Sequence, residues 1–195
     1  MTAYQHDISQ RTRWHYLKGY LIRWWSNLRY AYARSVARRH GATVGEGVVL
    51  PLSLARRANA NLVVGSHTTI QTDQLDLRNP LHIGSHVIIG AGTEILTTSH
   101  YIDDPDFARK DYGITIEDYV WLPTRILVLP SCRRVGYGAV VGSGSVVVRD
   151  VEAMAVMSGN PAKQIATRHT VHTDLVVESL LGGDFDAYCA ARKKS

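Results

Sequence analysis

The feature that most constrains the fold is a six-residue period that runs from Ile83 to Val148. Each unit opens with an aliphatic residue, usually followed by a small one, as in Ile89-Gly90 and Val141-Gly142. Neither a helix nor a flat strand produces this spacing, because their side chains repeat every 3.6 and every 2 residues. A period of six is typical of a solenoid in which three short strands and three corners close a coil of about 18 residues. The period therefore predicts an all-β solenoid, with small residues where the backbone turns sharply.

The repeat divides the chain into three predicted segments. Residues 1–41 precede the solenoid, residues 42–165 form it, and residues 166–195 form a C-terminal helical tail. Residues 1–10 are polar and predict a frayed end, and residues 50–61 keep only a loose period and predict a degenerate first coil. A polar excursion at residues 101–113 interrupts the repeat, and such surface loops commonly carry function. In the tail, residues 175–191 predict a helix that breaks at Gly182-Gly183.

Residues 11–39 predict an amphipathic helix whose surface outside the apolar stripe is basic. Its apolar side chains recur three or four apart, which is one stripe on a helix surface: Trp14, Leu17, Leu21, Trp24, Leu28 and Tyr32. One interpretation is a cap that lays this stripe over the solenoid, as repeat proteins require. The other is a peripheral helix at the inner membrane, with Trp and Tyr at the headgroups and Arg on anionic lipid. We favour the cap, although the two interpretations are compatible.

Composition limits the cellular compartment and the kinds of partner that we expect. The 195 residues carry a net charge of +5, which suits an anionic partner such as a nucleotide-bearing cofactor or a membrane. The two cysteines, Cys132 and Cys189, form neither a disulfide framework nor a zinc pattern and indicate a reducing compartment. The first residues lack the apolar region of a signal peptide, so we expect a cytoplasmic protein. The basic helix matches no nucleic-acid readout motif, and we expect no nucleic-acid partner.

Two motifs accompany the repeat. Ser99-His100-Tyr101 opens the excursion, and Ser158-Gly159-Asn160-Pro161-Ala162 closes the solenoid. With these motifs, residues 44–168 resemble the hexapeptide-repeat acyltransferases, and most closely the sugar O-acetyltransferases of the colanic-acid, galactoside and maltose type. The resemblance implies a left-handed parallel β-helix, a homotrimer and acetyl-CoA as the acyl donor, with no metal. It also implies O-acetylation of a sugar hydroxyl in a polysaccharide or its precursor.

His100 is the predicted general base. A sugar hydroxyl is a poor nucleophile until a base removes its proton, and an imidazole suits this role near neutral pH. From the residues alone, a solvent-facing corner histidine is an equal alternative. The resemblance favours catalysis, because His100 matches the family's histidine. Tyr101 stands where many relatives have an acid, so the group that orients the imidazole is not identified by the sequence.

The resemblance also implies the remaining site. Trp121 matches the family's tryptophan, and Thr124 holds the place of the backbone N–H that faces the thioester oxygen. Pro123 departs from the usual Gly or Ala. The predicted coenzyme A contacts are Gly142, Ser143, Arg149, Arg168 and, more weakly, Lys163. The predicted acceptor contacts are Asp73, near the place of the family's acceptor contacts, and Asn79 and His82, which are predicted from their positions in the coil before His100. His82 precedes His100 by 18 residues and is expected to stack one coil away from it.

Three alternatives stay open at this point. One is N-acylation of an amino sugar. Another is a zinc enzyme like the gamma-class carbonic anhydrases, because His67 and His86 occupy equivalent places in successive coils. The third is a scaffold without catalytic activity.

Overall fold

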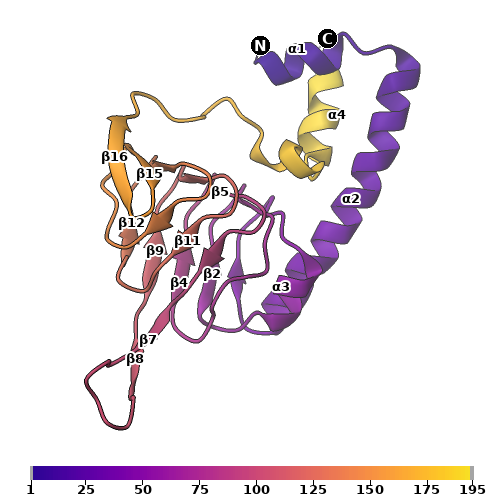
Figure 1. Ribbon diagram of the computed structural model, residues 1–195. Coiled ribbons are helices and arrows are strands. Elements are labelled where there is room, and N and C mark those ends of the chain that lie inside the picture. The colour runs from indigo at the N-terminus through magenta and orange to yellow at the C-terminus, as the bar shows by residue number, and fades with distance from the viewer. Residues whose placement is uncertain (1, 194–195) are drawn as a thin grey trace.

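Three sheets form the sides of a solenoid in the computed structural model, which describes residues 2–193 (Figure 1). The first sheet contains β1 (Thr43–Val44), β2 (Leu62–Val64), β4 (Leu81–Ile83), β9 (Ile114–Ile116) and β12 (Arg134–Val135). The second contains β3 (Thr69–Ile70), β5 (Ile88–Ile89), β10 (Trp121–Leu122), β13 (Val140–Val141), β15 (Ala155–Gly159) and β16 (Ala162–Thr167). The third contains β6 (Glu94–Ile95), β11 (Leu127–Val128) and β14 (Val146–Val147). Only the β15–β16 pair within these sheets is antiparallel.

The chain steps from one sheet to the next and winds around a single aliphatic core. Strands one coil apart pair in register, with Ile83 beside Ile116, and Ile95 beside Val128. These four side chains are buried, and each contributes about 1.5–3 kcal/mol by leaving water. The parallel sheets and their register confirm the solenoid that the six-residue period predicts. The left hand of the coil stays a prediction.

We call the turns that follow strands of the first, second and third sheets the first, second and third corners. At several corners the third residue has a positive φ, and it is often not glycine, as in His67 (56°) and Arg125 (53°). The small residue comes two positions earlier and has a different cause. A Cβ on Gly90 would lie 1.1 Å from the carbonyl oxygen of Pro123 in the next coil. The turn thus explains the left-handed backbone conformation of the third residue in the corner. Stacking of the coils explains the glycine at the first residue in the corner.

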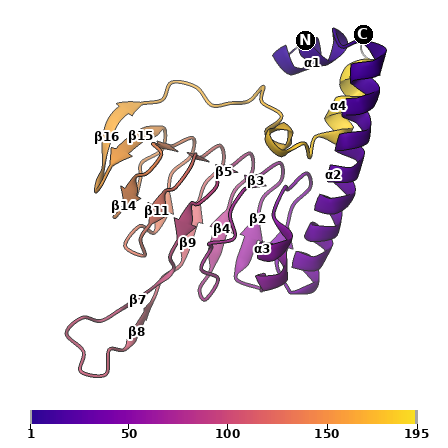
Figure 2. The same ribbon diagram turned by 45° about the vertical axis from the view of Figure 1, so that its right-hand side comes forward.

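The predicted excursion is a hairpin that projects from the third corner of the central coil (Figures 1 and 2). β7 (Thr98–His100) and β8 (Arg109–Asp111) pair antiparallel, with Thr98 opposite Asp111 and His100 opposite Arg109. The amide of the buried Asn79 donates to the carbonyl of Thr97, to Thr98 Oγ1 and to Asp111 Oδ1, each at 3.0 Å. Asn79 therefore fixes the base of the hairpin to the coil.

Three helices precede or interrupt the first coil. α1 (Ala3–Ser9) begins with a capping box, in which Thr2 and Gln5 exchange side-chain and backbone hydrogen bonds. The prediction of a frayed N-terminus is therefore wrong for the described residues, and the Thr2-x-x-Gln5 pattern was the missed signal. α2 (Arg13–Arg39) follows, and α3 (Leu52–Arg57) replaces the predicted degenerate coil. Leu54 and Ala55 are the buried residues of α3, which explains why residues 50–61 contain aliphatic residues without the six-residue period.

The C-terminal half of α2 covers the first coil, but not with the predicted face. Ala33 and Ala37 are buried in the core that the coils share, and Tyr30 is buried nearby. The predicted stripe faces away from the coil, with Trp14 73% exposed and Tyr32 57% exposed. The expectation that the aromatic stripe lies over the solenoid is therefore wrong, because small side chains allow the helix to approach the coil closely. No helix within residues 2–193 is long and apolar enough to cross a membrane.

The C-terminal tail returns along the coil from β16 to α2 (Figure 2). It ends in a short 3₁₀ helix, η1 (Val177–Leu181), and in α4 (Phe185–Lys193). Gly182 caps η1 with a φ of 68°, which confirms the predicted break. Tyr188 of α4 is fully buried against Ile8 and Tyr16, so α1, α2 and α4 form a second, smaller core.

Candidate functional site

His100 lies at the end of β7 with its ring exposed on the hairpin. Its Nδ1 lies 2.7 Å from the backbone carbonyl oxygen of Phe107, and the two rings stack with centroids 4.3 Å apart. Phe107 has a φ of 48°, so the loop bends its carbonyl back toward the histidine. The orienting group that the sequence left unidentified is thus a backbone carbonyl seven residues further along the chain.

This contact fixes the tautomer of the neutral imidazole. A carbonyl oxygen only accepts hydrogen bonds, so Nδ1 carries the hydrogen and donates it to Phe107. Nε2 then holds a lone pair, which is what a general base requires. A histidine held this way is prepared to accept a proton from a hydroxyl placed at its outer edge.

A second set of predicted residues meets at the second corners. Thr124 and Ser143 occupy equivalent places in adjacent coils, and their side-chain oxygens lie 3.1 Å apart. Gly142 precedes Ser143, and a Cβ on Gly144 would meet nothing within 4 Å, so the backbone is open to a neighbour there. Trp121 lies two residues before Pro123 on the outer face of β10, 43% exposed.

The second corners also present backbone donors. The N–H groups of Ala91, Thr124 and Ser143 form no hydrogen bond among the described residues, and all three residues are exposed. At the first corners, by contrast, side chains of the next coil accept these hydrogens, as Asp118 Oδ1 does from the N–H of Ser85 at 2.7 Å. A column of open N–H groups is suited to a negatively charged oxygen.

The remaining predicted cofactor contacts are dispersed. Arg149 is exposed at a third corner, and Lys163 is exposed on the edge strand β16. Arg168 lies beside the first corners, where its guanidinium donates to the carbonyls of Tyr119 (3.3 Å) and Gly138 (3.1 Å). Burial lowers the pKa of Arg168. These contacts tie the tail to the coil, so the expectation of a guanidinium open to a phosphate requires correction.

The predicted acceptor contacts do not converge in one chain. His82 pairs with Thr115 on the outer face of the first sheet and does not stack below His100, because the hairpin leaves the coil before an equivalent strand forms. Asn79 is buried beneath the hairpin, where its amide is already occupied. Asp73 is half-buried, and its carbonyl accepts from Arg57 at 2.9 Å. Their roles toward an acceptor stay predictions, with Asn79 better explained as a support.

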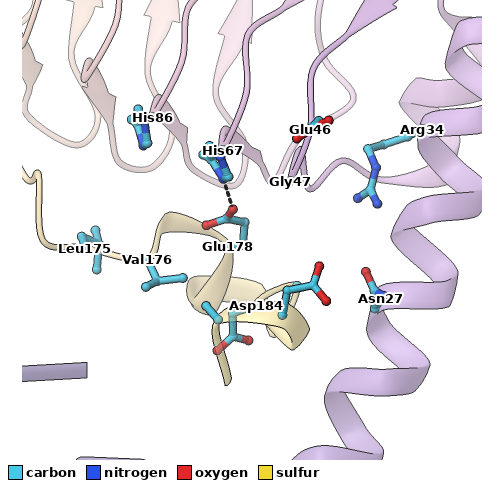
Figure 3. Close-up of a pocket in the computed structure, with 13 residues that line it drawn as sticks. Asn27, Arg34, Glu46, Gly47, His67, His86, Leu175, Val176, Glu178 and Asp184 are labelled. Carbon is cyan, nitrogen blue, oxygen red and sulfur yellow. Dashed lines mark hydrogen bonds and ion pairs between the residues drawn. The ribbon is translucent and has the colours of Figure 1, made fainter. Parts of the chain in front are cut away.

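A pocket of about 350 Å³ lies away from His100, between α2, the first corners and the tail (Figure 3). His67 and His86 stack along its wall with ring centroids 5.3 Å apart, as expected for equivalent places in adjacent coils. Glu178 of η1 reaches back to His67 Nδ1 across the pocket (Figure 3). No sequence pattern predicts this contact, because the two residues are 111 positions apart in the chain.

His67 and His86 do not belong to a set of described residues that could bind zinc. His67 contacts Glu178, and His86 stacks on Tyr119 at 4.8 Å. Within residues 2–193, no group of three or more His, Cys, Asp or Glu side chains could hold a metal ion. The paired histidines are explained by packing of the tail on the coil.

The contact between His172 of the tail and His86 of the coil predicts that stability depends on pH. His172 Nε2 donates to the carbonyl of His86 at 2.8 Å, and its Nδ1 accepts from Arg168 at 3.0 Å, so the ring must be neutral. Burial lowers the pKa of both His172 and His86 below the usual value of about 6.5. Their contribution is therefore present above about pH 6.5 and is lost as pH falls through the lowered values. We expect His172→Gln, which keeps a donor but does not titrate, to flatten the dependence of unfolding free energy on pH between about 5 and 7.

Denaturant unfolding at several pH values measures this effect. The matched control is His169→Gln, an exposed histidine of the same tail. Identical pH profiles for wild type and His172→Gln would contradict the prediction.

Comparisons with known proteins identify similar sequences and similar folds. A scan against protein-family models finds no match. WcaF of Escherichia coli K12, by name a colanic acid biosynthesis acetyltransferase, is 28% identical over 162 residues, which are 83% of this chain and 87% of that protein. A galactoside O-acetyltransferase of Lactococcus lactis is 33% identical over 85 residues, which are 42% of this chain and 40% of that protein.

The fold is shared with solved structures. A hexapeptide-repeat containing acetyltransferase of Vibrio cholerae superposes with a TM-score of 0.60 at 24% identity, over 85% of this chain and 87% of that one. The same protein has been solved with acetyl coenzyme A. These findings confirm the resemblance to the hexapeptide-repeat acyltransferases, and the chain is an acyltransferase.

Proposed function

We propose that the protein is an acetyl-CoA-dependent O-acetyltransferase that acts on a sugar hydroxyl of a polysaccharide or its precursor. The observation that carries the proposal is the held tautomer of His100, whose free Nε2 is exposed on a projecting hairpin. The proposal is supported by relatives that are named for acetyl transfer in colanic acid biosynthesis and to galactosides. It is also supported by related structures that contain acetyl coenzyme A or coenzyme A.

The reaction follows from these groups. His100 Nε2 accepts the proton of the acceptor hydroxyl as its oxygen attacks the thioester carbon. The carbonyl oxygen becomes negative, and the N–H of Thr124 donates to it. The carbon–sulfur bond then breaks, the acetyl group stays on the sugar oxygen, and the imidazolium returns its proton to the departing thiolate. Atoms and charges balance without a metal or a redox partner.

A second copy completes the site in this proposal. His100 lies on the hairpin at a third corner, whereas Thr124 and Gly142 lie at second corners, so one chain does not bring them together. The hairpin carries exposed apolar side chains, with Ile102 86% and Phe107 58% exposed, which a neighbouring copy would cover. We therefore propose a homotrimer in which the hairpin of one copy reaches the second corners of the next.

The donor and the compartment complete the proposal. Acetyl-CoA would lie along the open corner at Gly142 and Ser143, with Arg149 and Lys163 as exposed cations for its phosphates. The sparse cysteines suit a cytoplasmic enzyme. N-acylation of an amino sugar remains the alternative, since an amine could replace the hydroxyl at the same base.

Release of free thiol from acetyl-CoA, measured across sugars, amino sugars and nucleotide sugars, tests the proposal. Acceptor-dependent release with an ester product supports O-acetylation, and an amide product supports the alternative. No release with any acceptor, together with no acetyl-CoA binding, would reject both.

The open N–H of Thr124 can be removed without changing the turn. Among residues 124 and 125 only Arg125 has a positive φ, which is the order of φ signs in a type II turn. Such a turn favours proline at the position that Thr124 occupies. Thr124→Pro deletes the donor, and we expect kcat to fall by about 10²–10³-fold. Thr124→Ala keeps the N–H and should stay close to wild type. Steady-state kinetics with circular dichroism of each variant measures the effect.

The control for this substitution is Ala91→Pro. Ala91 occupies the same turn position one coil earlier, before Gly92 with a φ of 68°. We expect Ala91→Pro to fold and to retain activity. Equal losses in Thr124→Pro and Ala91→Pro would mean that the turn, and not the donor, causes the effect.

A further inference from the structure

One face of α2 is unpartnered along most of the helix. Seven large apolar side chains on this face are exposed, at 40–73% of their surface: Trp14, Leu17, Leu21, Trp24, Trp25, Leu28 and Tyr32. The buried residues of this helix, Gly19, Tyr30, Ala33 and Ala37, lie on the opposite side. Soluble monomers rarely expose contiguous apolar patches of this extent, and such patches mark interaction surfaces. We call these seven side chains the α2 face.

The α2 face is bordered by cations. On a helical projection Lys18 and Arg29 lie beside the stripe on one side, Arg13 lies on the other, and all three are exposed. α2 contains no Asp or Glu. Arg23, on the buried side, is instead committed to Asp184 at 2.9 Å. The charge around the α2 face is therefore entirely positive along the helix.

This charge pattern distinguishes two possible partners of the α2 face, a second copy of the chain and an anionic lipid surface. A second copy that met the α2 face through the same face would bring the cations that border one helix close to those that border the other, without any acid on either helix to pair with them. An anionic lipid surface matches both features, because acyl chains accept Trp and Leu while phosphates attract Lys and Arg. No described helix can cross a bilayer, so the helix would lie in the surface plane.

We infer that the α2 face docks the enzyme on an anionic membrane surface, with the three tryptophans at headgroup level. This inference goes beyond the proposed chemistry and does not depend on it. It would place the site near an acceptor that is carried on a lipid.

Vesicle co-sedimentation of the full-length protein tests the inference. At low salt we expect binding to mixed phosphatidylcholine and phosphatidylglycerol vesicles, loss of binding on adding salt, and little binding to phosphatidylcholine alone. Trp14→Ser combined with Trp25→Ser should lower vesicle affinity by at least about tenfold, because it removes the apolar anchor. The charge reversal Lys18→Glu with Arg29→Glu should have a similar effect.

Two controls make the result specific. Arg56→Glu changes an exposed arginine of α3 and should bind vesicles like wild type. Light scattering of the Trp14→Ser/Trp25→Ser variant should show an unchanged oligomeric state. A change in that state, or no wild-type binding to anionic vesicles at low salt, would overturn the inference. Acetyl transfer to a free sugar, measured without vesicles, reports separately on the proposed function.

Discussion

Replacing His100 with alanine should lower kcat for acetyl transfer by about 10²–10⁴-fold, the usual contribution of a general base. The reason is geometric as well as chemical. Nδ1 is tied to the carbonyl of Phe107 at 2.7 Å, so Nε2 is the only ring nitrogen able to accept a proton from an acceptor. Acetyl-CoA binding should survive, because the predicted cofactor contacts Gly142 and Ser143 lie at a second corner, away from the hairpin. Steady-state kinetics and a direct acetyl-CoA titration measure the two effects separately.

Two further variants distinguish the base from the hairpin. His100→Asn can place an amide N–H near the position of Nδ1 and keep the bond to Phe107, but it supplies no base. We expect it to be as inactive as His100→Ala. Substantial turnover by His100→Asn would show that the residue orients the loop and does not accept the proton. His169→Ala, on the tail, serves as the neutral control.

Mixed oligomers test whether the site is shared between copies. When His100→Ala and Thr124→Pro chains are combined at random, about a quarter of the interfaces in a closed ring pair an intact hairpin with an intact corner. Activity should therefore recover to about that fraction if neighbouring copies build the site. No recovery in verified mixed oligomers would place both groups within one chain.

The sequence predicted the coil because its signal is local and repeated. Every aliphatic residue of the period, such as Ile89 or Val128, contacts its equivalents one coil away, so one pattern determines both strand and register. His67 and His86 were placed correctly for the same reason, since they share a position in that pattern. The break at Gly182 was also local, because a left-handed residue ends η1 there.

What the sequence did not predict depends on contacts between distant segments. α2 packs on the first coil through Ala33 and Ala37, because their small side chains allow the helix to approach the coil closely. The more hydrophobic Trp14 and Trp25 stay exposed. The partner of His100 is a backbone carbonyl, which carries no residue signature. Arg168 looks like a phosphate ligand in sequence, yet it binds the carbonyls of Tyr119 and Gly138 because the tail crosses those corners.

Gly90→Ala should destabilise the protein by at least about 4 kcal/mol, a large part of the 5–15 kcal/mol that holds a typical domain folded. The added Cβ would lie 1.1 Å from the carbonyl oxygen of Pro123 and 2.2 Å from its carbonyl carbon. Neither atom belongs to a flexible side chain, so two stacked coils would have to separate. The N–H of Gly90 also donates to the carbonyl of Leu122 at 2.7 Å, which that separation would break. Urea unfolding, or soluble yield if the variant does not fold, measures the loss.

Gly113→Ala is the matched control, because it adds the same methyl group to a glycine outside the stack. Its Cβ would lie 3.5 Å from the carbonyl oxygen of Pro80, an ordinary contact, and Gly113 has no positive φ. We expect it to unfold within about 1 kcal/mol of wild type, with a small gain because alanine restricts the unfolded chain. The pair separates the two explanations for small residues at corners. If tight turning of the backbone were the cause, Gly90→Ala would be tolerated, since Gly90 does not have the positive φ that disfavours alanine. If coil stacking is the cause, only Gly90→Ala fails.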